Sequence, residues 1–334
     1  MNSLNLPADD SLMERAISNA EKVRGSTAPN PWVGAVLLSP DNELFDGATE
    51  PPGGAHAERV AIDMAGPKAK GATLFTTLEP CSHQGRTPPC VSQIIESGVS
   101  RVVTGITDPD PQVSGTGVDA LRAAGIEVVE GVKERQIAKQ LEAYIHHRTT
   151  GKPWVVLKMA MTIDGRTAAP DGSSEWITSQ EAREDVHGLR ARCDSVMVGA
   201  GTIRSDNPSL TTRFVSGVSP QRIVLGKAPK EALVHPCWEM DGDLREVLSE
   251  LGNRGVVDLL VEGGATVAAA IHQQGLVNEY VFYLAPALMG GDDGHPVFMG
   301  QGSSTMSNLW RGNLHDVRKV GSDIRVEFRP VEGD

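Results

Sequence analysis

The chain lacks the usual marks of membrane, secreted and nucleic-acid-binding proteins. No uninterrupted apolar run among its 334 residues approaches the roughly 20 residues of a membrane span. The segment from Met1 to Asp10 has no basic region followed by an apolar core, so we expect no secretory signal and a cytoplasmic location. The formal net charge of −12 argues against a nucleic-acid partner, because such proteins usually carry a basic stripe. A small anionic substrate remains compatible, since it needs only a local group of Arg side chains or backbone N–H donors.

Cysteine is scarce, and this limits the roles that it can have. Four cysteines in this length do not suggest a disulfide scaffold, and a reducing cytoplasm keeps thiols available as metal ligands. Cys193 and Cys237 have no partners at metal spacing, and we interpret them as packing thiols. The length suits two domains that each bury a core, and a homo-oligomer is compatible with the sequence.

The first half reads as alternating helices and strands. A capping-box pattern from Ser11 to Glu14 predicts the start of a helix. The remaining predicted elements are strands at 32–38, 72–77, 101–106 and 126–132 and helices at 56–65, from about 90, at 117–124 and at 134–147. Such alternation favours a sheet covered by helices on both faces, a three-layer α/β sandwich.

A polar stretch at 147–153 interrupts this pattern, and we place a domain boundary there, between residues 1–150 and 151–334. The second half alternates again. We predict strands at 154–161, 195–198, 222–225, 256–261, 280–284 and 324–328 and helices at 179–190, 242–251 and 265–274. Periodicity alone indicates only an α/β domain here.

His56 and Glu58, followed by Cys81 and Cys90, form the most informative motif. Zinc deaminases use H-x-E, then P-C and a second cysteine, with the Glu left unligated as a proton shuttle. Here His56, Cys81 and Cys90 supply three zinc ligands, leaving a fourth position for water, and Glu58 is the expected catalytic base. Because residues i and i+2 do not share a helix face, His56 must stand at the very first turn. The prolines before both cysteines predict that each thiol sits at a helix start.

A closed structural zinc site is the alternative interpretation of this motif. Structural sites normally have four protein ligands, and His83 could supply the fourth.

Four segments together resemble one known family. They are TTLEPCSHQGRTPPC at 76–90, PNPWVG at 29–34, TIDGRT at 162–167 and SEWIT at 174–178. In type and order they are similar to the bifunctional deaminase-reductase of riboflavin biosynthesis, over nearly the whole chain. The resemblance implies a cytidine-deaminase-like N-terminal sandwich and a dihydrofolate-reductase-like C-terminal domain. It also implies two reactions on a pyrimidine ribose phosphate, a zinc-dependent hydrolytic deamination and an NADPH-dependent reduction of ribosyl to ribityl.

The resemblance also assigns site residues. The deaminase substrate is expected at Asn30, His83, Arg86 and Asp108, although Asp110 stands where the family pattern has Asn. NADPH is expected at Ala160, Trp176, Thr202, Asp206 and Gly264. The reductase substrate is expected at Ser174, Arg190, Leu210, Arg213 and Glu262, with the two arginines as a phosphate clamp. No G-x-G-x-x-G follows the first strand of this half, which argues against a Rossmann domain.

Two other function classes stay open at this point. One is a nucleic-acid deaminase of the tRNA adenosine type with an accessory C-terminal module, although the chain lacks interleaved aromatic and basic residues. The other is a deaminase whose second domain is only structural.

Overall fold

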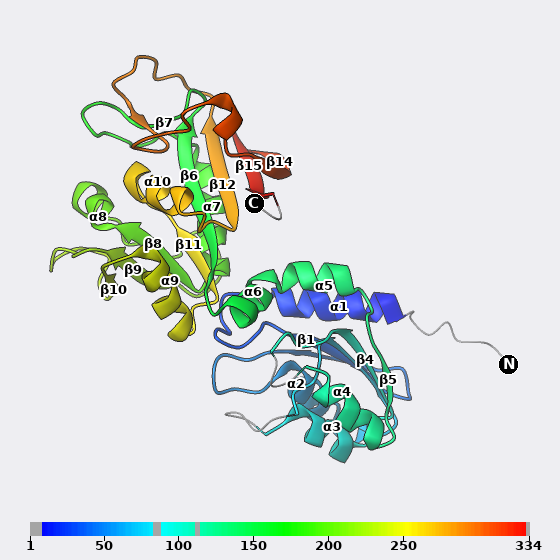
Figure 1. Cartoon of the computed structure of the whole chain (residues 1–334). Coiled ribbons are helices and arrows are strands. Elements are labelled where there is room, and N and C mark those ends of the chain that lie inside the picture. Colours follow the sequence, from blue (N-terminus) through cyan, green and yellow to red (C-terminus); the bar gives the residue numbers. More distant parts are fainter. Residues whose placement is uncertain (1–8, 83–87, 111–113, 332–334) are drawn as a thin grey trace. The chain divides into compact units, whose positions relative to one another are not determined.

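A computed structural model describes residues 9–82, 88–110 and 114–331 of the chain (Figure 1). The chain divides into two compact units, Met1–Gly151 and Lys152–Asp334, and each is described by itself. Within the described ranges, no helix has the length and apolar character needed to cross a membrane.

The first unit is a three-layer α/β sandwich. Its five-stranded sheet has the order β2-β1-β3-β4-β5, in which β2-β1-β3 are antiparallel neighbours and β3-β4-β5 are parallel ones. Helices α1 and α5 cover one face of this sheet, and α2, α3 and α4 cover the other (Figure 1). The elements are α1 (Asp9–Glu21), β1 (Gly34–Leu38), β2 (Leu44–Ala48), α2 (Ala57–Ala65), η1 (Gly66–Ala69), β3 (Thr73–Leu78), α3 (Cys90–Ser97), β4 (Arg101–Ile106), α4 (Thr116–Ala123), β5 (Glu127–Val129), α5 (Glu134–Gln140) and α6 (Glu142–Thr150).

The central strands are apolar on both faces because helices cover both faces. Val36, Leu74 and Val102, from three adjacent strands, are completely buried. At Gly34 the backbone of β1 approaches α1 so closely that an added Cβ would lie 1.9 Å from the Ala16 carbonyl oxygen. Only glycine fits there, and it sets the distance between helix and sheet.

The second unit contains an eight-stranded sheet in the order β10-β9-β8-β11-β6-β12-β15-β14. The six strands from β10 to β12 are parallel, and β15 and β14 add antiparallel pairs. The elements are β6 (Trp154–Thr162), β7 (Arg166–Ala168), α7 (Gln180–Arg192), β8 (Ser195–Gly199), α8 (Ala200–Asp206), β9 (Gln221–Leu225), β10 (Trp238–Met240), α9 (Leu244–Asn253), β11 (Asp258–Val261), α10 (Ala265–Gln273), β12 (Glu279–Ala285), β13 (His295–Pro296), η2 (Met306–Asn308), β14 (Gly312–Val320) and β15 (Asp323–Pro330).

Two hydrophobic clusters lie on opposite sides of this sheet. One packs α9 and α10 through Val247, Leu251 and Ile271, and the other packs α7 and α8 through Leu189 and Ile203. The sequence predicted the main parallel strands and the helix that begins near Ser179, and the Ser179 hydroxyl caps that helix by accepting a hydrogen bond from the Ala182 N–H at 3.2 Å.

Three local predictions were wrong. Helix α1 already includes Asp9 and Asp10, so the residues from Ser11 to Glu14 lie inside it and form no capping box. The single helix predicted at 134–147 is two helices that meet at Leu141. The polar stretch at 147–153 is helical as far as Thr150, because the chain turns only at Gly151, which has a left-handed backbone.

Replacing Gly34 with Ala should destabilise the first unit. The added Cβ would clash with the backbone of α1 at Ala16 and Ala20, which cannot move aside as a flexible side chain can. Overpacking of this kind costs roughly 1–3 kcal/mol. Chemical denaturation should show the loss, whereas Gly302→Ala, which meets no atom within 4 Å, should leave the unfolding free energy nearly unchanged. Equal stability of the two variants would contradict the close helix–sheet approach.

Candidate functional site

Three different elements of the first unit bring the zinc-ligand candidates together. His56 is the residue just before α2, Cys81 follows the carboxyl end of β3, and Cys90 is the first residue of α3. The expectation that His56 stands at the first turn is confirmed, since its extended backbone caps the helix. Glu58, one residue into α2, is buried.

The donor atoms converge with the spacing of a tetrahedral site. Cys81 Sγ lies 3.6 Å and Cys90 Sγ 3.3 Å from His56 Nδ1, and the three donor atoms all lie within 4.8 Å of one another. Zn–N and Zn–S bonds of about 2.0 and 2.3 Å at a tetrahedral angle imply nitrogen–sulfur separations of about 3.6 Å. The geometry and the donor types therefore fit zinc, with Nδ1 as the ligand nitrogen.

The charges at this cluster also suit a cation. A hydrogen bond from the Cys90 thiol, together with His56, lowers the pKa of Cys81 to about 4, so one thiolate is ready to bind metal. The same hydrogen bond and burial raise the pKa of Cys90 well above its usual range. Burial, and beyond it the charge of Cys81, raises the pKa of Glu58 to about 7. Three acidic groups thus crowd one buried space, and a dication relieves that crowding.

Cys81 does not start a helix, contrary to the prediction. It lies in an irregular segment, and its sulfur instead accepts a hydrogen bond of 3.4 Å from the Cys90 backbone N–H. The N-terminus of α3 therefore stabilises the Cys81 thiolate, although Cys81 lies in a different segment of the chain. The first residue of the same helix provides the Cys90 thiol.

Glu79, which the sequence prediction missed, fixes the chain beside Cys81. The residue is only 3% exposed, and its two carboxylate oxygens accept four backbone N–H hydrogen bonds. The donors are Asp108, Gly115, Gly117 and Val118, at 3.2, 2.9, 2.9 and 3.2 Å. Two of them are N–H groups of the first turn of α4 that have no partner within the helix. Glu79 therefore joins the end of β3, the start of α4 and the Asp108 segment.

Of the four residues predicted to bind the deaminase substrate, the structure describes two. Asp108 is buried and accepts hydrogen bonds from the Tyr144 hydroxyl at 3.2 Å and from the Asp110 N–H at 2.9 Å. Asn30 has its backbone fixed by hydrogen bonds with Thr27. His83 and Arg86 lie outside the described residues.

The second unit contains a cleft of about 1100 Å³ at the carboxyl ends of β8 and β11. Its volume slightly exceeds the roughly 300–1,000 Å³ of a typical small-molecule pocket, as expected if two ligands share it. All ten residues predicted to bind the cofactor or the reductase substrate line this cleft: Ala160, Ser174, Trp176, Arg190, Thr202, Asp206, Leu210, Arg213, Glu262 and Gly264.

A buried ion pair forms the floor of the cleft. Arg190 donates two hydrogen bonds to Glu262, at 2.6 and 3.0 Å, and a third to the Thr211 carbonyl at 3.3 Å. Lys158 lies 3.8 Å from the same carboxylate. Although burial opposes the charge, the two cations hold the pKa of Glu262 below its ordinary value. Arg190 is thus occupied by protein groups, whereas the Arg213 side chain is exposed and has no ion-pair partner among the described residues.

The candidate cofactor residues lie around the same cleft. Trp176 is 69% exposed, with the Arg183 guanidinium 4.4 Å from its ring centre. Gly264 caps α10, and the Thr202 hydroxyl lies beside it, 3.4 Å from where a Cβ would stand.

Lys158 was also missed, although the sequence carries a signal for it. It is the one charged residue in the apolar strand β6, and a lysine within a strand that is buried on both faces needs a partner or a function. Glu79 has a weaker signal, since only its position before Pro80 and Cys81 draws attention to it.

Comparison with known proteins identifies the family. A model described as the RibD C-terminal domain matches residues 153–326, and one described as the cytidine and deoxycytidylate deaminase zinc-binding region matches residues 7–106. Riboflavin biosynthesis protein RibD of Mycobacterium tuberculosis is 42% identical over 343 aligned positions that cover 98% of this chain and 99% of that protein. The chain belongs to the RibD family.

Other RibD proteins agree over the full length. The Escherichia coli RibD protein is 34% identical, with 95% of this chain and 98% of that protein covered. The structure of Acinetobacter baumannii RibD matches with a TM-score of 0.90 at 35% identity, covering 97% of this chain and 99% of that one. A Thermotoga maritima structure, described as a diaminohydroxyphosphoribosylaminopyrimidine deaminase/5-amino-6-(5-phosphoribosylamino)uracil reductase, matches with a TM-score of 0.87 at 37% identity, covering 97% and 99%.

Membership in the RibD family settles the class of activity. The chain is a bifunctional enzyme of riboflavin biosynthesis, with a zinc-binding deaminase domain of the cytidine deaminase type and an NADPH-dependent reductase domain. Neither a tRNA-type deaminase nor a merely structural second domain is supported, because the reductase-domain match spans most of the second unit.

Glu79→Ala should loosen the segment next to the metal cluster. Four backbone N–H groups would lose their acceptor, and each buried unsatisfied donor costs about 1–3 kcal/mol. Hydrogen exchange at the amides of Gly117 and Val118 should accelerate by at least a hundred-fold in the full chain. Glu96→Ala, at an exposed carboxylate on α3, is the matched control and should leave both amides protected. Unchanged protection in Glu79→Ala would show that α4 does not depend on this carboxylate.

Proposed function

We propose that the first unit deaminates 2,5-diamino-6-ribosylamino-4(3H)-pyrimidinone 5′-phosphate and that the second unit reduces the ribosyl group of the product to ribityl with NADPH. We assign the first reaction to residues 1–150 and the second to residues 151–334, working in sequence in a reducing cytoplasm. The observation that carries the proposal is the convergence of His56 Nδ1, Cys81 Sγ and Cys90 Sγ beside the buried Glu58, in a chain similar along its length to RibD proteins.

In the deaminase, His56, Cys81 and Cys90 hold the metal, and all four cysteines of the chain are free thiols. Zinc held by these three ligands would lower the pKa of a water molecule and so supply a nucleophile at neutral pH. Water adds at the amino-bearing carbon, the carbon–nitrogen bond breaks, and ammonia leaves. Glu58 accepts the proton of the attacking water and returns it to the departing nitrogen. Asn30 and Asp108, with His83 and Arg86, orient the pyrimidine and its phosphate.

In the reductase, the chain aligns donor and acceptor. NADPH, when bound, would supply the hydride that C1′ of the opened ribosylamine accepts. Ala160, Trp176, Thr202, Asp206 and Gly264 hold the cofactor along the cleft, and Ser174, the backbone at Leu210 and Glu262 hold the sugar. Lys158 is the cation nearest Glu262 besides Arg190, and it is our candidate to donate a proton to the reacting nitrogen.

Of the two arginines predicted to bind the substrate phosphate in the reductase, only one has a guanidinium that is not already bonded to protein groups within the described part of the chain. Because Arg190 already donates to Glu262 and to the Thr211 carbonyl, we propose Arg213 as the residue that binds the substrate phosphate and Arg190 as a support for the floor. A planar guanidinium at the cleft surface suits a phosphate dianion.

Replacing the metal ligands and the catalytic base one at a time tests the metal assignment, because only the ligands should be needed for zinc binding. Cys81→Ser and Cys90→Ser should lose zinc and deaminase turnover together, because a hydroxyl is a poor replacement for thiolate. Glu58→Gln should keep about one zinc per chain but lose at least a hundred-fold in turnover, because its carboxylate moves protons and is not a ligand. Zinc content by elemental analysis and ammonia release measure the two properties. Loss of zinc in Glu58→Gln, or normal turnover, would contradict this assignment, and Glu96→Gln serves as the exposed carboxylate control.

The two arginines of the cleft should respond differently to replacement. Arg213→Ala should raise KM for the phosphorylated substrate by about ten- to a hundred-fold, since a charge-assisted contact contributes roughly 1.5–3 kcal/mol. Its effect on the dephosphorylated substrate and on NADPH affinity should be small.

Arg190→Ala should weaken turnover of both substrates and lower stability, because it leaves the buried Glu262 with one less partner. Arg311→Ala, at an exposed position outside the cleft lining, is the control. Phosphate-dependent loss in Arg190→Ala but not in Arg213→Ala would reverse these roles.

A further inference from the structure

The segment that carries Arg213 has no helix or strand of its own. It follows α8 and precedes β9, and its backbone is left-handed at Asn207 (φ 42°) and at Leu210 (φ 53°). At Leu210 this conformation is unfavourable unless neighbours impose it, whereas Asn207 ends α8 at a position where a left-handed Asn is common. The contacts that hold the segment therefore decide where the Arg213 guanidinium lies.

His187 of α7 supplies one of these contacts. Its side chain is buried, with 4% of the residue exposed, and it lines the cleft. The Arg213 backbone N–H donates a hydrogen bond of 3.1 Å to His187 Nδ1. The Phe214 ring packs edge-on against the imidazole, with 4.9 Å between ring centres. Since Nδ1 accepts here, the imidazole is neutral and its proton is on Nε2.

Arg190 supplies a second contact from the same helix. It lies three residues after His187, and positions i and i+3 are neighbours on a helix surface. Arg190 donates to the Thr211 carbonyl at 3.3 Å while its other donors hold Glu262. Helix α7 thus holds the segment by hydrogen bonds on both sides of Thr212, to the carbonyl of the preceding residue and from the N–H of the following one.

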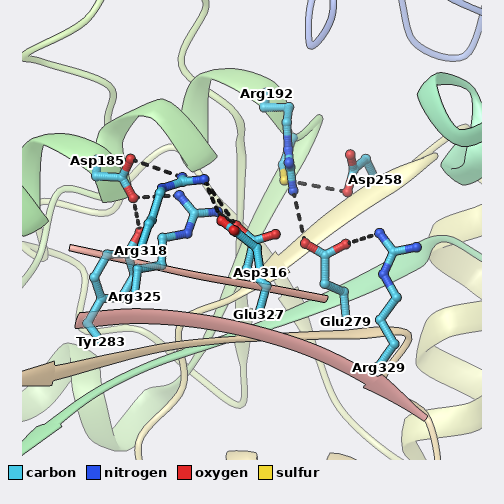
Figure 2. A network of polar contacts seen from close by, with 11 residues as sticks. Asp185, Arg192, Asp258, Glu279, Tyr283, Asp316, Arg318, Arg325, Glu327 and Arg329 are labelled. Carbon is cyan, nitrogen blue, oxygen red and sulfur yellow. Dashed lines mark hydrogen bonds and ion pairs between the residues drawn. The ribbon is translucent and has the colours of Figure 1, made fainter. Parts of the chain in front are cut away.

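Helix α7 is itself anchored to the sheet by a polar network on its other side (Figure 2). Asp185 accepts hydrogen bonds from the Tyr283 hydroxyl and from Arg325, and lies 3.7 Å from Arg318. Figure 2 also shows Arg192 reaching toward Glu279, 3.7 Å away. With this anchoring, α7 is a fixed support for the Arg213 segment.

We propose that His187 is a positioning residue of the reductase, which holds the Arg213 backbone so that the guanidinium meets the substrate phosphate. The proposal rests on the function proposed above and adds to it a residue that acts through another. It also implies that protonation of the imidazole releases the segment, because an imidazolium has no acceptor to offer the Arg213 N–H.

The groups around His187 keep it neutral over a wide pH range. Arg190 on its own helix and Arg213 on the segment face it, and Glu262 at the end of β11 opposes them, with Lys158 of β6 beyond that carboxylate. Burial first, and then the two arginines, lower the pKa of His187 to about 4. Because this pKa is lowered in the folded state, the stabilisation is fully present above the usual histidine pKa of about 6.5 and is lost as pH falls through about 4. In the folded protein the contact itself persists until pH approaches 4.

Two replacements separate the hydrogen bond from the packing. His187→Phe keeps a ring against Phe214 but offers no acceptor, whereas His187→Asn can place a carbonyl oxygen near the Nδ1 position and does not titrate. In the full chain with NADPH at pH 7, His187→Phe should raise KM for the phosphorylated substrate about five- to ten-fold. The change with the dephosphorylated substrate should be under about two-fold. His187→Asn should recover most of the loss.

The pH profile provides a second readout. A phosphate monoester itself titrates near pH 6, so KM will change with pH in every variant. Down to about pH 5 the natural enzyme and His187→Asn should change in parallel, and as pH falls from about 5 through about 4 the natural enzyme should lose more affinity, because only the natural enzyme can protonate its acceptor. Coincident profiles would overturn the proposal, as would equal losses of His187→Phe on both substrates.

A double-mutant comparison distinguishes failure of this proposal from failure of the proposed function. If His187 acts through Arg213, then His187→Phe combined with Arg213→Ala should be no worse than Arg213→Ala alone. If Arg213→Ala raises KM only for the phosphorylated substrate but His187→Phe raises it for both substrates, the proposal about His187 is wrong and the assignment of the phosphate site to Arg213 stands. If Arg213→Ala itself shows no phosphate selectivity, the phosphate contact assigned under the proposed function fails, and the role of His187 fails with it.

Discussion

Both candidate sites depend on one constraint of α/β architecture. Parallel strands end at the same edge of a sheet, and the helices that follow them begin there. The N-termini of these helices, with N–H groups that have no partner within the helix, therefore gather at that edge. In the first unit, Cys81 follows β3, while α2 begins just after His56 and α3 begins at Cys90. In the second unit, β8 and β11 lead directly into the starts of α8 and α10 around the cleft. The sheets therefore bring together residues that are far apart in the sequence.

Charge is handled differently at the two sites. Around His56 the acidic groups exceed the cations, so the pKa values of Cys90 and Glu58 are raised, and a bound cation would favour their charged forms. In the cleft, Glu262 is matched by Arg190 and Lys158, and additional positive charge remains at Arg213. One site is thus suited to a metal ion, and the other to an anionic ligand. This contrast arises within a chain whose net charge of −12 indicates neither.

The sequence predicted the residues that carry out the chemistry better than the contacts that hold those residues in place. His56, Glu58, Cys81 and Cys90 could be found because zinc chemistry restricts residue types and spacing, and the first-turn position of His56 followed from helix geometry. The main causes of the low Cys81 pKa, which are the hydrogen bond from the Cys90 thiol and the contact with His56, could not be found in this way, because these groups belong to other elements. The bond between Arg190 and Glu262 spans 72 positions, and a local pattern carries no information about such pairs. Strand β14 was missed because it is an edge strand with mostly exposed, polar residues, so it shows no buried alternation.

The anchoring of α7 has a consequence for the order in which the protein is made. Asp185 is paired with Arg325, 140 positions later, on the strand that ends the described part of the chain. During synthesis, α7 emerges long before Arg325, so the helix that supports the reductase cleft lacks this partner until β15 has been made. The three ligands of the metal cluster, by contrast, lie within the first 90 residues of the chain. A chain whose synthesis stops between β12 and β15 would thus have its metal ligands complete and the support of its reductase cleft unfinished.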